Sequence, residues 1–279
     1  MVAEILECKS LRDEILKPIK EHYFKNHANG SLVVVSIGSD PASEAYVRSK
    51  KNTARECCIP FEHYTFSADV DFKTIKEKFY GIANCKYTSG IILQLPTKLS
   101  YEEEQELIEL IPDWKDIDGL KESKMYLNDT QAKYIPCTPQ GIMRLLAWKH
   151  IPWIGKHVVV MGRSNLVGKP IANLLIQHGA TVTVCNSLTE NPLQYTSRAD
   201  IIISAVGKPE FITKSCIKKG AICIDVGITR MDDGKLHGDF SPNVADIAKM
   251  ITPVPGGIGL LTVACLMYNY WKADSGIKR

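Results

Sequence analysis

The 279-residue sequence lacks the features that mark several large classes of protein. No apolar run reaches the length needed to span a membrane. Basic and acidic residues nearly balance, at 34 and 31, so no strong field of one sign indicates nucleic acid or a membrane surface as partner. With 45% hydrophobic and 23% charged residues, the composition predicts an ordered globular protein. A net charge of +3 is compatible with a modestly cationic site for an acidic ligand.

The nine cysteines also lack a recognisable pattern. Their number is odd and no Cys-x-x-Cys pair occurs, so we predict neither a disulfide framework nor a metal site. Cys185 and Cys223 stand in apolar surroundings, where a free thiol behaves as a small core residue. The first residues lack the basic and then apolar pattern of a signal peptide, and we therefore expect a cytoplasmic protein.

What the sequence does contain is an alternation of helical and strand patterns. A continuous apolar run, Ser31 to Ile37, is typical of a strand buried on both faces of a parallel sheet. Asp40 and Pro41 resemble the cap and first position of a helix that continues to about Cys57. This first series of expected elements comprises a helix at 11–24, strands at 31–37, 63–66 and 90–93, and helices at 41–57, 72–83 and 102–110.

The strand pattern restarts near residue 140, which predicts a second domain. The expected elements there are a helix at 139–148, strands at 157–161, 181–185, 200–205 and 221–226, and a last helix at 261–272 after a Pro-Gly-Gly loop. The fold class that follows is α/β, with two three-layer domains separated by a cleft and the second domain of Rossmann type. We expect the domains to cover 1–140 and 141–260, with the helix within 261–279 packing back on the first.

A glycine turn between a strand and a helix indicates a dinucleotide site. The strand Val158 to Met161 is followed by a turn that contains Gly162 and Gly168, and then by a helix to about His178. Such a turn lets phosphate approach the backbone, and the helix start presents free amides and the positive end of its dipole. The alternative is that both glycines serve only close packing, because their spacing departs from Gly-x-Gly-x-x-Gly.

The next strand predicts which dinucleotide binds. NAD-selective sites carry an acidic residue at its end, whereas this sequence has Cys185, Asn186 and Ser187 there. Arg163, in the turn itself, is suited to pair with the 2′-phosphate of NADP, and the Ser187 hydroxyl to add a hydrogen bond. We therefore expect NADP in preference to NAD. The alternative for Arg163 is a solvated loop charge.

A candidate active site lies in the first half of the chain. Tyr46 and Lys50 are four residues apart on a predicted helix and hence share one face. A lysine beside an aromatic ring in a partly apolar pocket can act as acid, base or electrostatic partner. Gln94, with Leu95 and Pro96, follows a predicted strand at its carboxyl end, where its amide would orient Lys50. The alternative is a solvated lysine beside a core tyrosine.

A carboxylate-rich loop, residues 112–119, offers a group to hold a nitrogen-rich ring. Asp113, Asp116 and Asp118 are the candidates, and spacing does not choose among them. The alternative is that all three are solvated or close a turn.

Six motifs in order resemble the bifunctional methylenetetrahydrofolate dehydrogenase / methenyltetrahydrofolate cyclohydrolase family over nearly the whole chain. They are Asp-Pro-Ala-Ser-Glu-Ala-Tyr-Val-Arg-Ser-Lys at 40–50, Gln-Leu-Pro at 94–96, Lys-Asp-Ile-Asp-Gly at 115–119, Pro-Cys-Thr-Pro at 136–139, Gly-Arg-Ser-Asn-Leu-Val-Gly-Lys-Pro at 162–170 and Thr-Pro-Val-Pro-Gly-Gly-Ile-Gly at 252–259. Each motif is modest by itself, but chance similarity of all six is improbable.

The resemblance implies a role for each matched residue. Lys50 matches the catalytic lysine, Tyr46 the pterin-stacking tyrosine, Gln94 the glutamine that tunes the lysine, and Asp118 the aspartate that holds the pterin. The implied substrate-binding set is Tyr46, Gln94, Leu95, Pro96, Asp118, Pro255, Gly256 and Gly257. The implied cofactor-binding set is Gly162, Arg163, Ser164, Gly168, Ser187 and Ile228.

The same resemblance implies a tetrahydrofolate one-carbon substrate, NADP as cofactor and a homodimer. Two residues depart from the family pattern: Asn186 replaces a common histidine and Leu260 a common proline, so ribose recognition and substrate affinity are open to change. The alternatives are a monofunctional folate dehydrogenase, a dehydrogenase similar to shikimate dehydrogenase, and a dinucleotide-sensing protein without chemistry.

Overall fold

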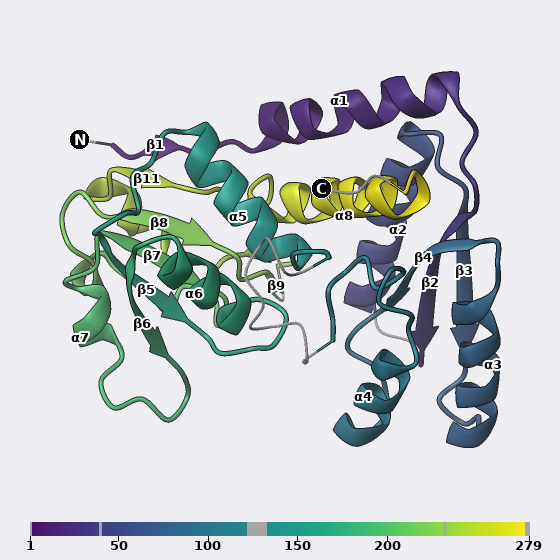
Figure 1. Ribbon diagram of the computed structural model, residues 1–279. Helices are drawn as coiled ribbons and strands as arrows, with labels where there is room; N and C mark the ends of the chain where they lie inside the picture. Colours follow the sequence, from purple (N-terminus) through teal and green to yellow (C-terminus); the bar gives the residue numbers. More distant parts are fainter. Residues whose placement is uncertain (1, 39–40, 122–132, 232, 277–279) are drawn as a thin grey trace. The chain divides into compact units, whose positions relative to one another are not determined.

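The computed structural model describes residues 2–38, 41–121, 133–231 and 233–276, and the chain forms two compact units. Unit 1 contains the residues up to Asp13 and Thr138–Thr262. Unit 2 contains the described residues from Glu14 to Cys137 and those from Val263 onward. Both are α/β, and helices cover their parallel sheets (Figure 1).

Unit 1 is built on a six-stranded sheet of order β1-β11-β8-β7-β5-β6 in which all neighbours are parallel. The strands are β1 (Glu4–Ile5), β5 (His157–Met161), β6 (Thr181–Cys185), β7 (Ile201–Ser204), β8 (Ile222–Asp225) and β11 (Met250–Ile251). The helices are α5 (Cys137–Trp148), α6 (Gly168–Gln177), α7 (Leu193–Thr196), η2 (Lys214–Cys216) and η3 (Pro242–Asp246). A short antiparallel pair, β9 (Thr229–Arg230) and β10 (Leu236–His237), stands apart from the sheet.

Strand β5 is the switch point of this sheet. Its successor β6 lies on one side and β7 on the other, so the two crossovers leave in opposite directions. Because such crossovers are right-handed, they run over opposite faces and leave a crevice at the carboxyl end of β5. Met161 is opposite Cys185 and Ser204, and Ser204 is opposite Asp225. The loops after all four strands therefore leave from one edge.

Unit 2 repeats this layout on three parallel strands of order β3-β2-β4. They are β2 (Ser31–Ile37), β3 (Phe61–Phe66) and β4 (Thr88–Leu93), with helices α2 (Pro41–Glu56), α3 (Phe72–Asn84) and α4 (Tyr101–Glu109). Val33, Val35 and Ile91 pack with Phe79 of α3 and Leu107 of α4. The alternate β2 residues Leu32 and Val34 are fully buried as well, so both faces of the sheet are covered.

Two helices run through both units, α1 (Lys9–Lys25) and α8 (Ile258–Asp274). The end of α8 is fastened to unit 2 by Asp274, whose carboxylate accepts hydrogen bonds from the amides of Asn29 (3.0 Å) and Gly30 (3.1 Å) and from the Ser89 hydroxyl (2.6 Å). Asn29 and Gly30 directly precede β2, and Ser89 lies at the start of β4. The last helix therefore packs on the β2–β4 unit.

Most predicted elements occur where the sequence placed them. Strands at 31–37, 157–161 and 181–185 have the predicted bounds, and the remaining predicted strands and helices differ by one to three residues at an end. The predicted Asp40 cap lies outside the described residues. The sequence interpretation missed β1, β11 and the β9–β10 pair, each only two residues long.

The N-terminal strand corrects the expected organisation. Residues 1–140 were expected in one domain, yet β1 pairs in parallel with β11 of the other unit's sheet. A two-residue strand carries too little periodicity to be predicted.

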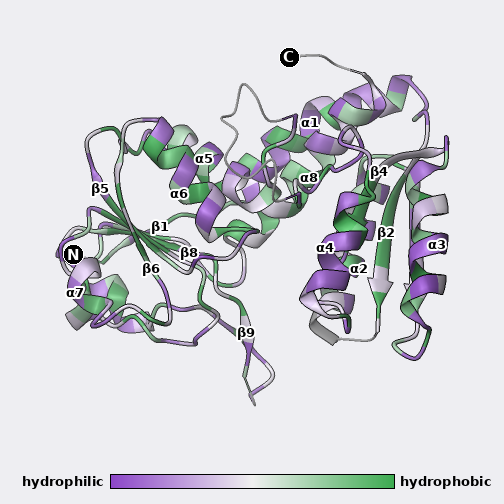
Figure 2. Cartoon of the chain, turned by 60° about the horizontal axis from the view of Figure 1, so that its bottom comes forward, coloured by the Kyte–Doolittle hydropathy of each residue, from purple (hydrophilic) through white to green (hydrophobic). Residues whose placement is uncertain are grey.

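Hydropathy follows the layers: the central strands are apolar and the outer helices are polar on one side (Figure 2).

Every helix within the described residues is too short or too polar to span a membrane. The same residues contain no cluster of three or more His, Cys, Asp or Glu side chains suited to hold a metal ion.

Candidate functional site

Lys50 lies in the buried stripe of α2. Ser43, Val47, Lys50 and Ala54 are buried at helical spacing, and Lys50 is only 8% exposed. A lysine is seldom buried to this degree unless its ammonium has a partner. Tyr46, one turn earlier, is 37% exposed, and burial of part of its ring raises the pKa of its hydroxyl. The solvated-lysine alternative is therefore wrong.

Gln94 is the partner of Lys50. The Lys50 Nζ donates to Gln94 Oε1 at 2.9 Å, and the Gln94 Nε2 donates to the carbonyl oxygen of Leu95 at 2.8 Å. The second bond fixes which end of the amide faces the lysine. The Gln94 backbone amide donates to Val35 at 2.8 Å, so strand β2 positions the residue at the end of β4. Pro96 is exposed after a cis peptide bond.

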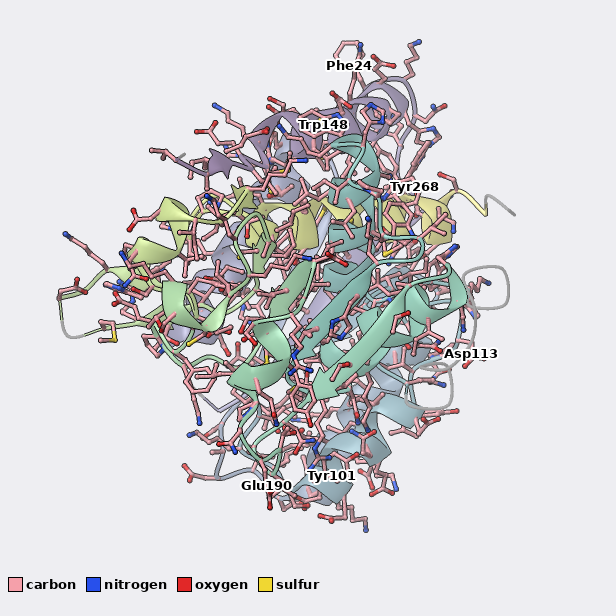
Figure 3. All side chains as sticks on the ribbon, turned by 90° about the vertical axis from the view of Figure 1, so that its left-hand side faces the viewer. Phe24, Tyr101, Asp113, Trp148, Glu190 and Tyr268 are labelled. Atoms are coloured by element: carbon pink, nitrogen blue, oxygen red, sulfur yellow. The ribbon has the colours of Figure 1, made fainter. Side chains whose placement is uncertain are left out.

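The structure separates the three aspartates of the loop 112–119. Asp113 is exposed, on the right-hand side of Figure 3. Its carboxylate pairs with the Lys121 Nζ at 3.0 Å. Asp116 is 4% exposed and accepts from the amides of Leu120 (3.0 Å) and Lys121 (3.2 Å), so it closes the turn. Burial raises the pKa of Asp116 to about 6. Asp118 is partly exposed and takes part in neither role.

Cys137 and Asn269 support this loop, and the sequence interpretation assigned no role to either. The Cys137 thiol is buried and donates to the Ile117 carbonyl oxygen at 3.6 Å, and Asp118 and Lys50 lie within electrostatic range of it. Burial raises the pKa of the thiol well above its usual value, so Cys137 is neutral. Asn269 of α8 donates to the carbonyl oxygens of Ile117 (2.9 Å) and Ile135 (3.1 Å). The Pro-Cys-Thr-Pro motif was the available signal for Cys137.

In unit 1, the turn after β5 requires both of its predicted glycines. Gly162 has φ +108° and donates to the Cys185 carbonyl at 2.8 Å. A Cβ at Gly162 would lie 2.7 Å from the Ala205 oxygen, and one at Gly168 would lie 2.1 Å from the Gly162 oxygen. The glycines thus do serve close packing, as the alternative held. That packing forms the turn at the switch point of the sheet, where α/β proteins bind nucleotides.

The start of α6 differs from the prediction in one respect. Free amides were expected there, but the Ser164 hydroxyl accepts from Val167 (3.2 Å) and Gly168 (3.4 Å), and the Ser164 carbonyl accepts from Lys169 (3.1 Å). The side chain of Ser164 therefore caps the first amides of α6. Helix propensity cannot reveal such a local cap, because serine is equally suited to bind a ligand or the backbone.

The turn after β6 closes on Asn186. Its side-chain oxygen accepts from the Leu188 amide at 2.9 Å, and its own amide donates to the Thr189 hydroxyl at 2.9 Å. Ser187 is exposed on this turn, and Arg163 is exposed on the turn after β5. Since β5 and β6 are neighbours in register, the two side chains leave from adjacent strand ends. The four residues that directly follow β6, Asn186 to Thr189, include no acidic residue, and Glu190 comes after them.

The remaining predicted residues also belong to unit 1. Ile228 is partly buried, and a Cβ at Gly259 would lie 3.6 Å from its Cδ1, so Ile228 adjoins the start of α8. Pro255 follows a cis peptide bond, Gly256 has φ +102°, and a Cβ at Gly257 would lie 2.4 Å from the Pro253 oxygen. The Pro-Gly-Gly loop is thus in a different unit from Tyr46, Lys50, Gln94 and Asp118.

Fold and geometry together define an α/β enzyme class: a Rossmann-type unit joined to a second α/β unit that carries a buried lysine. Two family models match the chain. The catalytic domain of tetrahydrofolate dehydrogenase/cyclohydrolase matches residues 6–118, and the NAD(P)-binding domain of the same family matches residues 136–277. The chain belongs to the tetrahydrofolate dehydrogenase/cyclohydrolase family.

Individual relatives agree with this assignment. The bifunctional protein FolD of Dechloromonas aromatica is 43% identical over 275 residues, which are 96% of each chain. The crystal structure of the bifunctional FolD enzyme from Campylobacter jejuni has a TM-score of 0.90 at 33% identity, covering 98% of this chain and 99% of that one. The Trypanosoma brucei FolD structure, complexed with NADP cofactor and inhibitor, has a TM-score of 0.91 at 28% identity, covering 99% and 98%.

The shikimate dehydrogenase alternative shares only the fold. The Aquifex aeolicus enzyme has a TM-score of 0.58 at 16% identity over 91% of this chain and 96% of that one. Two-domain dehydrogenases of this kind thus share the general architecture. The family resemblance inferred from the six motifs is confirmed.

Proposed function

We propose that this chain oxidises 5,10-methylenetetrahydrofolate to 5,10-methenyltetrahydrofolate with NADP and hydrolyses the product to 10-formyltetrahydrofolate. The observation that carries the proposal is the buried Lys50, held at 2.9 Å from Gln94 in a chain of the tetrahydrofolate dehydrogenase/cyclohydrolase family. A lysine that is fixed in a polar contact inside a helix stripe is suited to chemistry rather than to solvation.

Each group of unit 2 has a task in this scheme. Lys50 transfers protons when water adds to the methenyl carbon and the ring opens. Gln94 holds the Lys50 ammonium in place through an oxygen whose direction is fixed by Leu95. The half-exposed Tyr46 ring provides the stacking face for the pterin, and Asp118 accepts hydrogen bonds from its nitrogen atoms. Leu95 and Pro96 line the same end of β4.

Unit 1 provides the dinucleotide site. Bound NADP supplies the hydride acceptor for the first reaction. The glycine turn presents its backbone to the pyrophosphate at the end of β5, and a Cβ at either glycine would disrupt this turn by clashing with the backbone oxygen of Ala205 or Gly162. Arg163 makes no hydrogen bond or ion pair with the part of the chain that the structure describes, so its guanidinium is available to the 2′-phosphate, with Ser187 beside it. Ile228 and Ser164 are the remaining residues that we assign to cofactor binding. We assign Pro255, Gly256 and Gly257 to binding of the folate.

The absence of an acid directly after β6, from Asn186 to Thr189, favours NADP over NAD. The Asn186 side-chain oxygen accepts a hydrogen bond from the Leu188 amide, so this oxygen is not directed at the 2′-phosphate, which it would repel. Asn186 thus serves the turn rather than the ribose, whatever residue stands there in relatives.

One assay tests the proposal. Purified protein is given methylenetetrahydrofolate with NADP or with NAD, and absorbance follows the reduced dinucleotide and then the methenyl product. We expect reduction of NADP at the higher rate, followed by decay of the methenyl signal. Reduction without that decay would favour the monofunctional alternative. Binding of NADP without any reduction would favour the dinucleotide-sensing alternative.

We further propose a cytoplasmic homodimer. All nine cysteines are free, as expected of a chain in a reducing compartment. Among the residues that the structure describes, no strand pairs with the outer side of the edge strand β3, which exposes Tyr64, so a second copy has a surface on which to pair. Light scattering during gel filtration tests the dimer: a mass of one chain at micromolar concentration would contradict it.

A further inference from the structure

Two carboxylates lie buried at the carboxyl edge of the unit 1 sheet. Asp225 is the last residue of β8 and is 4% exposed, and Asp239, just after β10, is 1% exposed. No ion pair joins either one to a lysine, arginine or histidine in the described part of the chain. Their charge is therefore balanced by hydrogen-bond donors alone, which is a costly arrangement in a protein interior.

Asp239 binds the loop that follows β7. Its Oδ2 accepts from the Ser204 hydroxyl at 2.7 Å and from the Val206 amide at 2.9 Å, and its Oδ1 accepts from the Lys208 amide at 2.9 Å. Ser204 is the last residue of β7 and is fully buried. One carboxylate thus fixes the direction in which the chain leaves β7.

Asp225 binds the loop that follows its own strand and joins it to Asp239. Its Oδ1 accepts from the amides of Gly227 (3.0 Å) and Asp239 (3.1 Å), and its Oδ2 accepts from the Phe240 amide (3.1 Å). Its own amide donates to the Thr252 hydroxyl at 2.7 Å, at the start of the Pro-Gly-Gly loop. The two aspartates therefore connect the loops after β7, β8, β10 and β11.

The adjacent glycines show how tightly these loops are held. A Cβ at Gly227 would lie 2.1 Å from Asp239 Oδ1, and a Cβ at Gly238 would lie 2.0 Å from Asp225 Oδ2. Any larger residue would push a carboxylate away from its donors.

We propose that Asp225 and Asp239 are positioning residues for dinucleotide binding, which hold the loops after β7 and β8 in the conformation that accepts NADP. The inference rests on the proposed function. These loops leave the sheet beside the glycine turn, and Ile228 of the predicted cofactor set follows Gly227 directly. The carboxylates themselves are buried beneath the loops and act through them.

The electrostatics support a positioning role over a purely stabilising one. Burial, with the nearby Asp239 charge, raises the pKa of Asp225 to about 7. The titratable groups that face Asp225 are Asp239 and the Cys223 thiol, and neither offers a positive charge. A carboxylate with this pKa adds little stability at neutral pH, yet it fixes three amides.

The test uses Asp239→Asn and Asp225→Asn in the intact protein, with Asp200→Asn as the matched control. Asp200 also accepts a backbone amide, that of His157 at 3.0 Å, but it stands at the amino end of β7, away from the binding edge. The readouts are the dissociation constant for NADP from fluorescence titration and the rate of methenyltetrahydrofolate hydrolysis without dinucleotide.

We expect each loop variant to raise the dissociation constant for NADP by about tenfold or more, the effect of losing a hydrogen bond to a charged group. Hydrolysis should stay within about twofold of wild type, and Asp200→Asn should change neither. An unchanged dissociation constant in both loop variants would overturn the proposal. Loss of hydrolysis together with NADP binding would also overturn it, since that is general unfolding.

Hydrogen exchange separates this proposal from the proposed function. The amides of Val206 and Lys208 should exchange faster in Asp239→Asn than in wild type, whether or not the protein turns over a folate. If wild type does not bind NADP, yet its Val206 and Lys208 amides exchange more slowly than those of Asp239→Asn, the proposed function fails and the loop-holding role stands. If the exchange of both amides is unchanged, the loop-holding role fails.

Discussion

Strands β5, β6 and β7 of unit 1 have the same relative order as strands β2, β3 and β4 of unit 2, with the first of each three in the middle, but the two units form their sites from different parts of the chain. In unit 1 the turn after the central strand β5 depends on backbone approach, with Gly162 and Gly168 too close for any side chain. In unit 2 the site depends on side chains, with Lys50 and Gln94 each 8% exposed. The same strand order thus carries two kinds of site. One is a backbone cradle, the turn that contains Gly162 and Gly168, and the other is the buried Lys50.

This difference follows from what each site has to do. A dinucleotide is large and charged, and backbone amides and exposed cations recognise it without a reactive side chain. Proton transfer to a folate needs one group at a fixed place, which calls for burial and a partner that sets its direction. The two functions should therefore be separable by substitution.

Lys50→Met should have the largest effect. Removal of the ammonium leaves Gln94 without its partner and should lower the rate of methenyltetrahydrofolate hydrolysis by about 10²- to 10⁴-fold, the usual contribution of general acid–base catalysis. Lys51→Met, at the exposed neighbouring position, is the control and should retain the wild-type rate. Hydrolysis by Lys50→Met at a rate close to that of wild type would refute the role given to Lys50.

Gly168→Ala should destabilise unit 1 and remove its dinucleotide site. The added Cβ would lie 2.1 Å from the Gly162 oxygen, and relief of that clash should cost about 1–3 kcal/mol of folding free energy and abolish NADP binding. Gly81→Ala is the control, because Gly81 is in α3 with no atom within 4 Å of its Cβ position, and the change should stabilise the helix slightly. Thermal unfolding and NADP titration measure both. Equal behaviour of the two variants would contradict the backbone cradle.

Much of this comparison was predictable from the sequence. Glycine, proline and apolar runs mark the turn at Gly162 and the strands β2, β5 and β6, because local conformation decides those elements. The Tyr46–Lys50 spacing predicts a shared face, and the structure adds that Lys50 is buried whereas Tyr46 is 37% exposed.

Other features depend on contacts between distant parts of the chain. The pairing of β1 with β11, the choice of Asp116 rather than Asp118 to close a turn, and the link between Asp225 and Asp239 have no local signature strong enough to predict them. The Ser164 cap is local, but its hydroxyl has two possible partners, and the sequence does not choose between them.

Arg163→Gln should sharpen the cofactor preference. Loss of the guanidinium should raise the dissociation constant for NADP by about 10- to 100-fold, as expected for a charge-assisted pair, and leave that for NAD nearly unchanged. Arg198→Gln, another exposed arginine of unit 1, is the control. Equal weakening of both dinucleotides would assign Arg163 to the pyrophosphate or to the fold instead.

The last prediction concerns the pH dependence of stability and a residue of unit 2. The pKa of Asp116 is raised to about 6 in the folded state from 3.8, so the stability from the protonated form is present below pH 4 and lost as pH rises through 6. Relative to Asp116→Asn, the free energy of unfolding of wild type should fall by roughly 1–3 kcal/mol between pH 4 and 7. Urea titrations at both pH values measure this difference, and a rise would contradict the sign.

The separation of the two sites is tested most directly by titrating NADP into Lys50→Met. The account predicts a dissociation constant within about twofold of wild type in a variant that no longer hydrolyses methenyltetrahydrofolate, because the lysine belongs to unit 2 and the cradle to unit 1. An increase of about tenfold or more, with the thermal unfolding temperature unchanged, would contradict that separation.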